Sequence, residues 1–401
     1  MKRRLTYLFS LLLIWLCLLL IGGSSSVIAQ SGEPVFQADV SYSFGQLLTF
    51  RLTADNIAAI ETATLFFQAP EFTSTYISPE LVVDETGDAF QLSHLVELST
   101  VQLAPFTTVT YWWQLQTAGG EQIRLPEQSF VYADNQFEWH NLAQGNTIVY
   151  WTGEENNLGQ IALDVVAEAR LHLQDFVSAP GELPLSIYIY PTSADLRAAL
   201  RLTGRDWVGA HAAPELGIVL VTAVNIRTAA TDLRQSLPHE MLHFYLYQVL
   251  RGNYQNVPVW LNEGLATLVE ITPRPAYEAV LAAAVVNQTT IPLHQLCTTL
   301  PAGDEQTLLA YAQSLSLVQY IQTTYGNQNL RDLLAAYADG ADCQTGVERV
   351  LSLTLAELNQ AWLRDLQPRS LLAQFIGQNG LWLLLLLGGI GLTSLLILKK
   401  P

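Results

Sequence analysis

The sequence predicts a multidomain chain with an N-terminal all-β sandwich, an α+β domain that becomes mostly helical, and one C-terminal transmembrane helix. Short alternating segments run to about residue 146, helical periodicity replaces them, and an uninterrupted apolar stretch lies near the C-terminus. Of the 401 residues, 50% are hydrophobic and only 14% are charged, a balance that favours membrane segments.

Residues 1–29 have the layout of a secretory signal peptide. A basic cluster, Lys2 to Arg4, precedes an apolar run from Leu8 to Ile21, and small residues lead to Ala29. We expect cleavage after Ala29, and an uncleaved anchor helix is the alternative.

Residues 381–398 predict the transmembrane helix, after a juxtamembrane linker at 369–380. Eighteen helical residues span about 27 Å, close to the thickness of a hydrocarbon core. The basic pair Lys399-Lys400 in the tail, residues 399–401, predicts a cytoplasmic C-terminus. The sequence therefore predicts a single-pass cell-membrane protein with an extracytoplasmic ectodomain.

The ectodomain is strongly acidic. All three lysines lie in the terminal segments, and removing them with Arg3 and Arg4 from the 19 basic residues leaves 14 against 36 acids, a net charge of −22. Such a field repels phosphate backbones, so we expect no nucleic-acid partner. The sequence does not indicate an oligomeric state.

Residues 30–146 have the pattern of a β-sandwich of the immunoglobulin or fibronectin type. Alternating segments such as residues 47–52, 63–67, 109–113 and 128–132 are separated by Gly, Asn, Asp and Pro. Trp112 and Trp113 are expected to pack in its core rather than to form a ligand platform.

Residues 147–368 form the predicted α+β domain. Strands are expected at residues 147–151, 185–190 and 217–222, and helices at 160–177 and 194–202, before a nearly all-helical remainder. The strand at 217–222 is expected to offer a sheet edge on which an extended peptide could pair.

The central motif of this domain is His239-Glu240-x-x-His243. On a helix the two imidazoles project from one face, one turn apart, so that both can bind one zinc ion. Glu240 is rotated by about 100° from His239, which leaves its carboxylate free to act as a base.

Zinc needs a third protein ligand, and Glu263 is the expected one. It lies in Trp260-Leu-Asn-Glu-Gly-Leu-Ala266, a new helix that opens after Pro258. The intervening residues allow the first helix to end and the chain to return. His294 is the main alternative, and one Zn²⁺ ion is expected.

H-E-x-x-H followed by W-L-N-E-G-L-A resembles the gluzincin metallopeptidases, in particular the peptidase MA-like family related to M1 and thermolysin-like zinc peptidases. The resemblance covers roughly residues 146–366. It implies a thermolysin-like domain, zinc on His239, His243 and Glu263, and Glu240 as general base. It also implies a tyrosine that stabilises the oxyanion.

Tyr311 matches the position of that tyrosine, and Tyr245 or Tyr277 could compete for the role. The G-x-M-E-N signature of M1 aminopeptidases is missing, because residues 209–213 read Gly-Ala-His-Ala-Ala. This departure favours an endopeptidase over an aminopeptidase. His211, in that stretch, is a minor candidate for a substrate contact.

Two further pairs of residues are expected to support the site or the fold around it. Thr267 and Glu270 lie one and two turns beyond Glu263 and are candidates to orient the imidazoles, with surface solvation the alternative for Glu270. Cys297 and Cys343 remain as an even pair in an exported chain, so we expect a disulfide rather than two free thiols.

The sequence therefore predicts a membrane-anchored extracytoplasmic zinc metallopeptidase that acts on peptide or protein substrates. The alternative is a non-catalytic cell-surface binding or adhesion protein with a structural or degenerate zinc site. The intact Glu240 disfavours that alternative, since a binding module has no need of a base beside the ligands.

Overall fold

The computed structural model describes residues 35–55, 60–70, 72–83, 89–154, 157–177, 183–201 and 210–367. The predicted signal peptide, juxtamembrane linker, transmembrane helix and tail lie outside these ranges. Within the described ranges, no helix is both long and apolar enough to cross a membrane.

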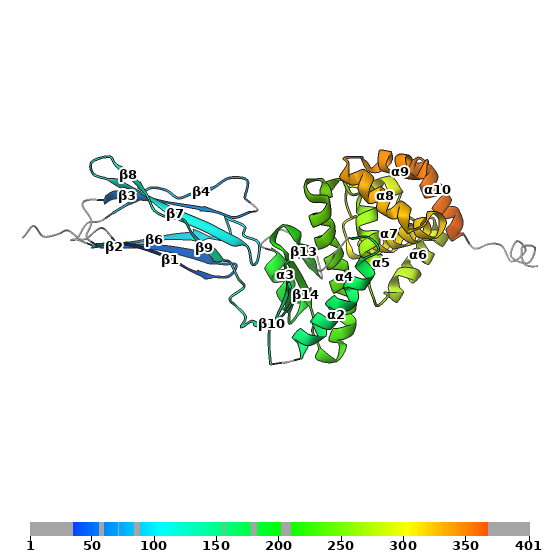
Figure 1. The fold of residues 1–401 in the computed structure, drawn as a ribbon, viewed down its shortest axis with the longest axis horizontal. Coiled ribbons are helices and arrows are strands. Elements are labelled where there is room, and N and C mark those ends of the chain that lie inside the picture. The colour runs from blue at the N-terminus through cyan, green and yellow to red at the C-terminus, as the bar shows by residue number, and fades with distance from the viewer. Residues whose placement is uncertain are drawn as a thin grey trace, which may run out of the picture. The chain divides into compact units, whose positions relative to one another are not determined.

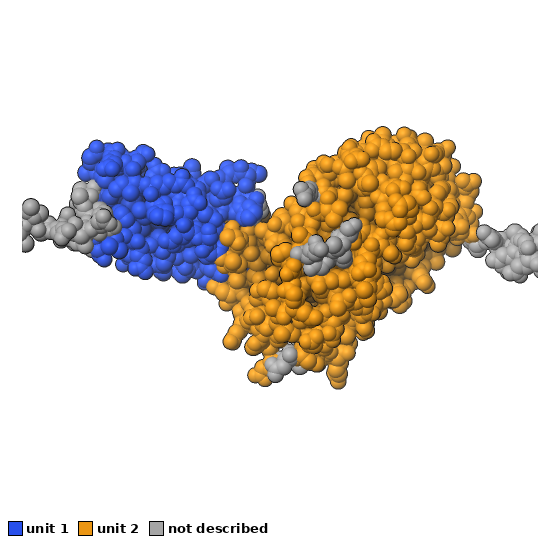
Figure 2. Space-filling model, viewed as in Figure 1, with its two compact units in different colours: residues 1–101, 109–130 blue, residues 102–108, 131–401 orange. Residues whose placement is uncertain are grey.

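The chain divides into two compact units, which Figure 2 shows in different colours. The first comprises residues 1–101 and 109–130, and the second comprises residues 102–108 and 131–401. The domain boundary expected from the sequence lies between residues 146 and 147. In the structure these residues are at the turn of the hairpin formed by β10 (His140–Gln144) and β11 (Thr147–Trp151), which belongs wholly to the second unit.

The first unit consists of two antiparallel sheets, visible as two layers in Figure 1. One sheet has the order β1 (Val35–Ser43), β2 (Leu47–Asp55), β6 (Ala89–Glu97). The other has the order β4 (Tyr76–Ile77), β3 (Ile60–Gln68), β7 (Thr108–Thr117), β8 (Gln122–Arg124), with β5 (Leu81–Val82) on β3 and β9 (Gln128–Val131) on β7.

Aromatic rings from the two sheets meet in the core of this unit. Phe50 on β2 stacks on Phe67 of β3 at 5.4 Å and contacts Tyr111 of β7 edge-on at 5.1 Å. Because side chains alternate along β7, Trp113 is buried in the core while Trp112 stands on the outer face beside Phe66. Core packing therefore holds for Trp113 but not for Trp112.

The second unit begins with a five-stranded mixed sheet. Its order is β10 (His140–Gln144), β11 (Thr147–Trp151), β12 (Leu185–Tyr190), β14 (Ile218–Thr222), β13 (His211–Ala213). The three central strands are parallel, and β10 and β13 are antiparallel edges. The expectation that residues 217–222 form an edge is wrong, because β13 pairs with β14 and takes the edge position.

Two helices, α2 and α4, cover one face of this sheet, and further helices form most of the rest of the unit. Val149 of β11, Ile187 of β12 and Val219 of β14 are neighbours in register across the sheet. Their side chains join one core with α2 and α4. The helices are α2 (Leu158–Leu173), α3 (Ser193–Arg201), α4 (Ile226–Leu250), α5 (Val259–Leu268), α6 (Pro275–Asn287), α7 (Asp304–Tyr325), α8 (Asn327–Ala338), α9 (Cys343–Leu351) and α10 (Leu355–Leu366). Short 3-10 turns are η1 (Pro214–Leu216), η2 (Arg251–Asn256) and η3 (Leu293–Cys297).

The described chain thus has N-terminal β-sheets followed by an α+β region whose C-terminal part is mostly helical, as predicted. The first helix of the second unit ends four residues earlier than expected, at Leu173. Cys297 of η3 and Cys343 of α9 are joined by a disulfide.

Candidate metal centre

The three predicted ligands come together from two helices that are consecutive in the chain. His239 and His243 lie on α4 and Glu263 lies on α5, and one ligand atom from each lies within 4.8 Å of the others. The Nε2 atoms of His239 and His243 are 3.3 and 3.5 Å from Oε2 of Glu263. His294, the rival ligand, is exposed on η3 and is not part of this cluster.

These separations match the spacing of ligands around one tetrahedral metal ion. Ligand atoms about 2.0–2.1 Å from zinc, at the tetrahedral angle, lie about 3.3 Å from each other. The observed 3.3 and 3.5 Å are therefore consistent with a zinc ion bound between the three side chains.

The outer nitrogen of each imidazole has its own oxygen partner. Nδ1 of His239 lies 3.1 Å from Oε1 of Glu270, and Nδ1 of His243 lies 3.2 Å from Oδ1 of Asn262. Since these oxygens accept hydrogen bonds, each Nδ1 can carry a hydrogen and leave Nε2, which faces Glu263, to bind a metal ion. Oε2 of Glu263 is buried and has no hydrogen-bond donor. The three facing atoms therefore favour a cation between them, either a proton or a metal ion.

The pKa shifts of His239 and Glu263 also indicate that the centre favours a bound cation. Burial lowers the pKa of His239, but the neighbouring carboxylates of Glu263, Glu270 and Glu240 outweigh burial and raise that pKa to about 10. Burial raises the pKa of Glu263, yet the two imidazoles hold it well below its usual range. The centre therefore favours a positive charge at neutral pH, and a metal ion that binds must displace a proton.

Pro238, directly before His239, explains how Glu270 reaches that imidazole. A proline inside a helix has no N–H, so the carbonyl of Arg234 one turn earlier loses its intrahelical donor. The N–H of Ile271 donates to that carbonyl at 3.0 Å. This bond fixes the chain just after α5 against α4 and places Glu270 beside His239.

Glu270 is also held from its other side. Its side chain is only 2% exposed, and its Oε2 accepts from Nε of Arg274 at 3.1 Å. The predicted contact of Glu270 with an imidazole is present in the structure. Thr267 behaves differently, because its hydroxyl donates to the carbonyl of Glu263 within α5 and to neither imidazole.

Glu240 is buried beside the ligands. Burial raises its pKa, His239 and His243 lower it, and the backbone N–H of Ala212 donates to its carboxylate. The edge strand β13 thus touches the carboxylate that the motif assigns as base.

Tyr311 of α7 is the tyrosine that faces the centre. Its ring lies 5.9 Å from that of His239. Burial raises its pKa above the usual range, with Glu263 and Glu240 adding to the effect, so the phenol stays protonated and can donate a hydrogen bond. Tyr245 is buried in the core, whereas Tyr277 lines a cavity at the centre together with Tyr311.

Two cavities meet at the centre, and both are lined by Ala210, His239, Glu240 and Tyr311. The Arg274 cavity, about 420 Å³, extends toward α3 and α6 and includes Ser193, Asp232, Arg274 and Tyr277. The Tyr254 cavity, about 430 Å³, extends toward η1 and η2 and includes His211, Pro214, Tyr247, Tyr254 and Leu300. The centre is therefore open along a cleft on two sides, and His211 lies in it.

Sequence reasoning missed three residues of the centre: Asn262, Tyr254 and Arg274. Asn262 directly precedes the expected ligand, so its proximity could have been inferred. It also donates to the Tyr254 hydroxyl at 3.0 Å. Tyr254 and Arg274 are placed by η2 and by the turn before α6, which carry no sequence pattern that predicts their direction.

The profile of the Peptidase MA superfamily matches residues 166–367, which is 202 of the 401 residues. No curated protein matches the chain.

Solved structures give only weak similarities. A purple acid phosphatase from yellow lupin (Lupinus luteus) seeds is 10% identical over 52% of this chain and 40% of its own, with a TM-score of 0.21. A polysaccharide deacetylase from Bacillus cereus is 7% identical over 42% and 55%, and a Bacteroides uniformis β-glucuronidase is 11% identical over 54% and 31%, both with TM-scores of 0.18. Such scores carry no argument about fold or activity.

The family match and the geometry agree on the same residues. The matched range contains α4, α5 and α7, which supply the ligands, the buried carboxylate and the tyrosine. The chain therefore belongs to the Peptidase MA superfamily and is a zinc metallopeptidase of that family, with His239, His243 and Glu263 as its metal site.

Proposed function

We propose that the chain is a membrane-anchored, extracytoplasmic endopeptidase of thermolysin-like architecture that binds one zinc ion. The observation that carries the catalytic part is the convergence of His239, His243 and Glu263 with Glu240 buried beside them. The anchoring part rests on the sequence of residues 1–29 and 381–401 alone.

Zinc held by His239, His243 and Glu263 would polarise the scissile carbonyl as a Lewis acid and would make an attacking water more acidic. Glu240 accepts the proton of the attacking water and delivers it to the leaving amine. Tyr311, protonated and directed at the centre, donates a hydrogen bond to the carbonyl oxygen as negative charge develops on it.

Cleavage of internal peptide bonds is supported by the two cavities. Each meets the centre at Glu240 and Tyr311, and they extend to different elements, so a chain can continue on both sides of the scissile bond. The sequence predicts residues 217–222 as the edge strand on which a substrate pairs. In the structure the edge strand is β13, beside Glu240, and we propose that an extended substrate pairs with its backbone.

Substitution of Glu240 by Gln tests the proposal directly. The Glu240→Gln protein should retain zinc, because the three ligands are unchanged, and should lose about 10²- to 10⁴-fold in kcat. Metal content is measured by elemental analysis and hydrolysis with a peptide library. Undiminished cleavage by a zinc-loaded variant would refute the assignment of Glu240 as base.

A further inference from the structure

α6 presents an unusually apolar surface. Among its thirteen residues only Glu278 and Asn287 are polar, yet only Tyr277 and Ala284 are buried. Val286 is 80% exposed. A helix that is apolar on all sides is normally covered, and no part of the chain that the structure describes covers this one fully. The surface is therefore suited to binding an apolar partner.

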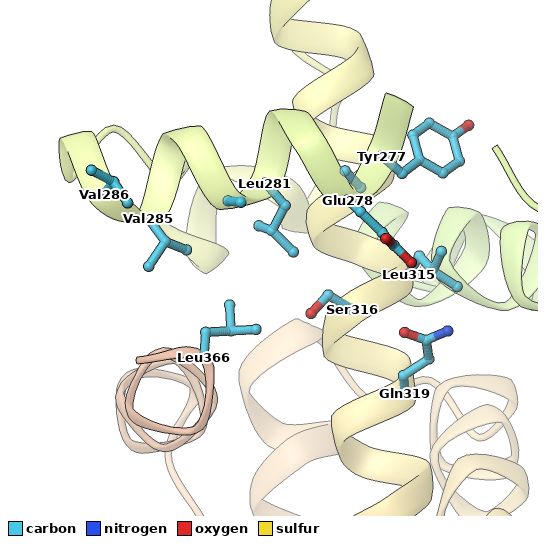
Figure 3. Close-up of a pocket in the computed structure, with 11 residues that line it drawn as sticks. Tyr277, Glu278, Leu281, Val285, Val286, Leu315, Ser316, Gln319 and Leu366 are labelled. Atoms are coloured by element: carbon cyan, nitrogen blue, oxygen red, sulfur yellow. The ribbon is translucent and has the colours of Figure 1, made fainter. Parts of the chain in front are cut away.

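A groove of about 440 Å³ runs along this helix, between α6, α7 and the end of α10. Figure 3 shows its labelled side chains, from Val286 at one end of α6 to Tyr277 at the other, with Leu366 of α10 opposite. We refer to it as the α6 groove. Glu278 is its only charged lining residue. An apolar, uncharged ligand would bury the most surface here.

The α6 groove borders the metal centre at one residue. Tyr277 lines both this groove and the Arg274 cavity. Leu281 and Val285 follow Tyr277 at intervals of four residues, so all three lie along one face of α6.

The facing helix shows the same arrangement. Leu315 and Gln319 of α7 follow Tyr311 at intervals of four residues and line the groove, while Tyr311 lines both cavities at the metal. On each of these two helices, which cross in Figure 3, a row of side chains therefore leads from a tyrosine at the metal centre to the groove.

We infer that the α6 groove binds an apolar segment of the peptide substrate, beside the bond held at the metal. From Tyr277 to Val286 the helix rises about 13.5 Å, which accommodates about four extended residues. The inferred substrate class is a peptide with an apolar run of about four residues on one side of the scissile bond. This inference rests on the proposed peptidase function.

Two other apolar segments could fill this groove, and the tyrosine that it shares with the metal centre favours the substrate over both. Residues 371–376 of the chain contain Leu371, Leu372, Phe375 and Ile376, and a second copy would also bring apolar surface. Neither explains why both rows of groove residues begin at tyrosines of the metal centre. A peptide held in the Arg274 cavity lies against Tyr277, which also borders the groove.

The test is a binding measurement on the full-length, zinc-loaded Glu240→Gln protein in detergent micelles, in which turnover cannot remove the probe. The probes are two fluorescein-labelled octapeptides that differ only in four central residues, Leu-Val-Leu-Val or Ser-Gln-Ser-Gln. Fluorescence polarisation should show the apolar probe binding about tenfold more tightly, or better.

A matched pair of exposed valines supplies the control. Val286→Glu places a charge in the groove and should abolish the preference for the apolar probe. Val249→Glu alters a valine on α4 that is 56% exposed and does not line the groove, and it should keep the preference. Because both valines are exposed, neither change should affect folding.

The possible outcomes separate this inference from the proposed function. Equal binding of both probes, or a preference that survives Val286→Glu, would overturn the inference. So would a dimer that Val286→Glu dissociates, or apolar binding that appears only after residues 371–376 are replaced by serine. If the preference holds but the native protein cleaves no peptide, the proposed function fails while the groove assignment stands.

Discussion

Gly264, which follows the ligand Glu263, is the position where the smallest change should disturb the metal centre most. A Cβ atom added there would lie 2.5 Å from the carbonyl oxygen of Ser314 and 2.5 Å from Cγ2 of Val318, both on α7. An ordinary contact begins at 3.4 Å, so α5 and α7 must separate by about 0.9 Å. The carbonyl belongs to the backbone and cannot rotate away.

That displacement acts directly on the chemistry, because α5 carries Glu263 and α7 carries Tyr311. Overpacking of this kind costs about 1–3 kcal/mol of folding stability. A misplacement of about 1 Å at reacting groups costs about 10²-fold in rate. We therefore expect Gly264→Ala to lower the thermal midpoint modestly, kcat/KM about 100-fold, and zinc affinity measurably.

Gly252 on η2 is the matched control, since a Cβ there would meet nothing within 4 Å. Gly252→Ala should leave the thermal midpoint, zinc affinity and kcat/KM within about twofold of the native values. Zinc affinity is measured by competition with a chromophoric chelator and stability by thermal unfolding. If Gly264→Ala matches Gly252→Ala in all three measurements, the close packing of α5 on α7 does not position the centre.

Three further substitutions address other parts of the peptidase unit. Tyr311→Phe should lower kcat by about 10²-fold with little change in KM, because one hydrogen bond to developing charge is lost; a changed KM with unchanged kcat would contradict that role. Glu270→Gln should weaken zinc binding about 10- to 100-fold by removing the carboxylate behind His239, and unaltered affinity in a chelator titration would show that this contact does not matter. Replacing both Cys297 and Cys343 by Ser opens a loop with a sequence separation of 46 and should cost about 4 kcal/mol in urea unfolding of the oxidised protein. An unchanged urea midpoint would contradict that stabilisation.

The parts of the centre that depend on local sequence were predictable. Two His four residues apart must share one helix face, and a Pro-opened helix with Glu263 was the natural source of a third ligand. The role of Glu270 was inferred from helical spacing alone, but its actual position depends on a hydrogen bond between Ile271 and Arg234 that Pro238 makes necessary. Thr267 was proposed from helical spacing in the same way, and yet its hydroxyl donates to the carbonyl of Glu263 within α5.

The strand order of the second sheet was not predictable, because a run such as residues 217–222 has the same composition at an edge or in the interior. The short segment His211–Ala213 has no strand pattern of its own and becomes a strand only by pairing with β14. That pairing decides which strand lies beside Glu240, and so which backbone is offered to a substrate.

What the sequence determined by itself is the local chemistry: two imidazoles and a carboxylate on one helix, an expected third ligand, and the alternation that forms β-sheets. What only the tertiary structure decided is every relation between helices that lie apart in the chain. These include the approach of α7 to α5 through Gly264, the contact of Asn262 with His243, and the groove along α6 that Tyr277 borders. Helical periodicity fixes the face on which a side chain lies, but packing fixes what that face meets.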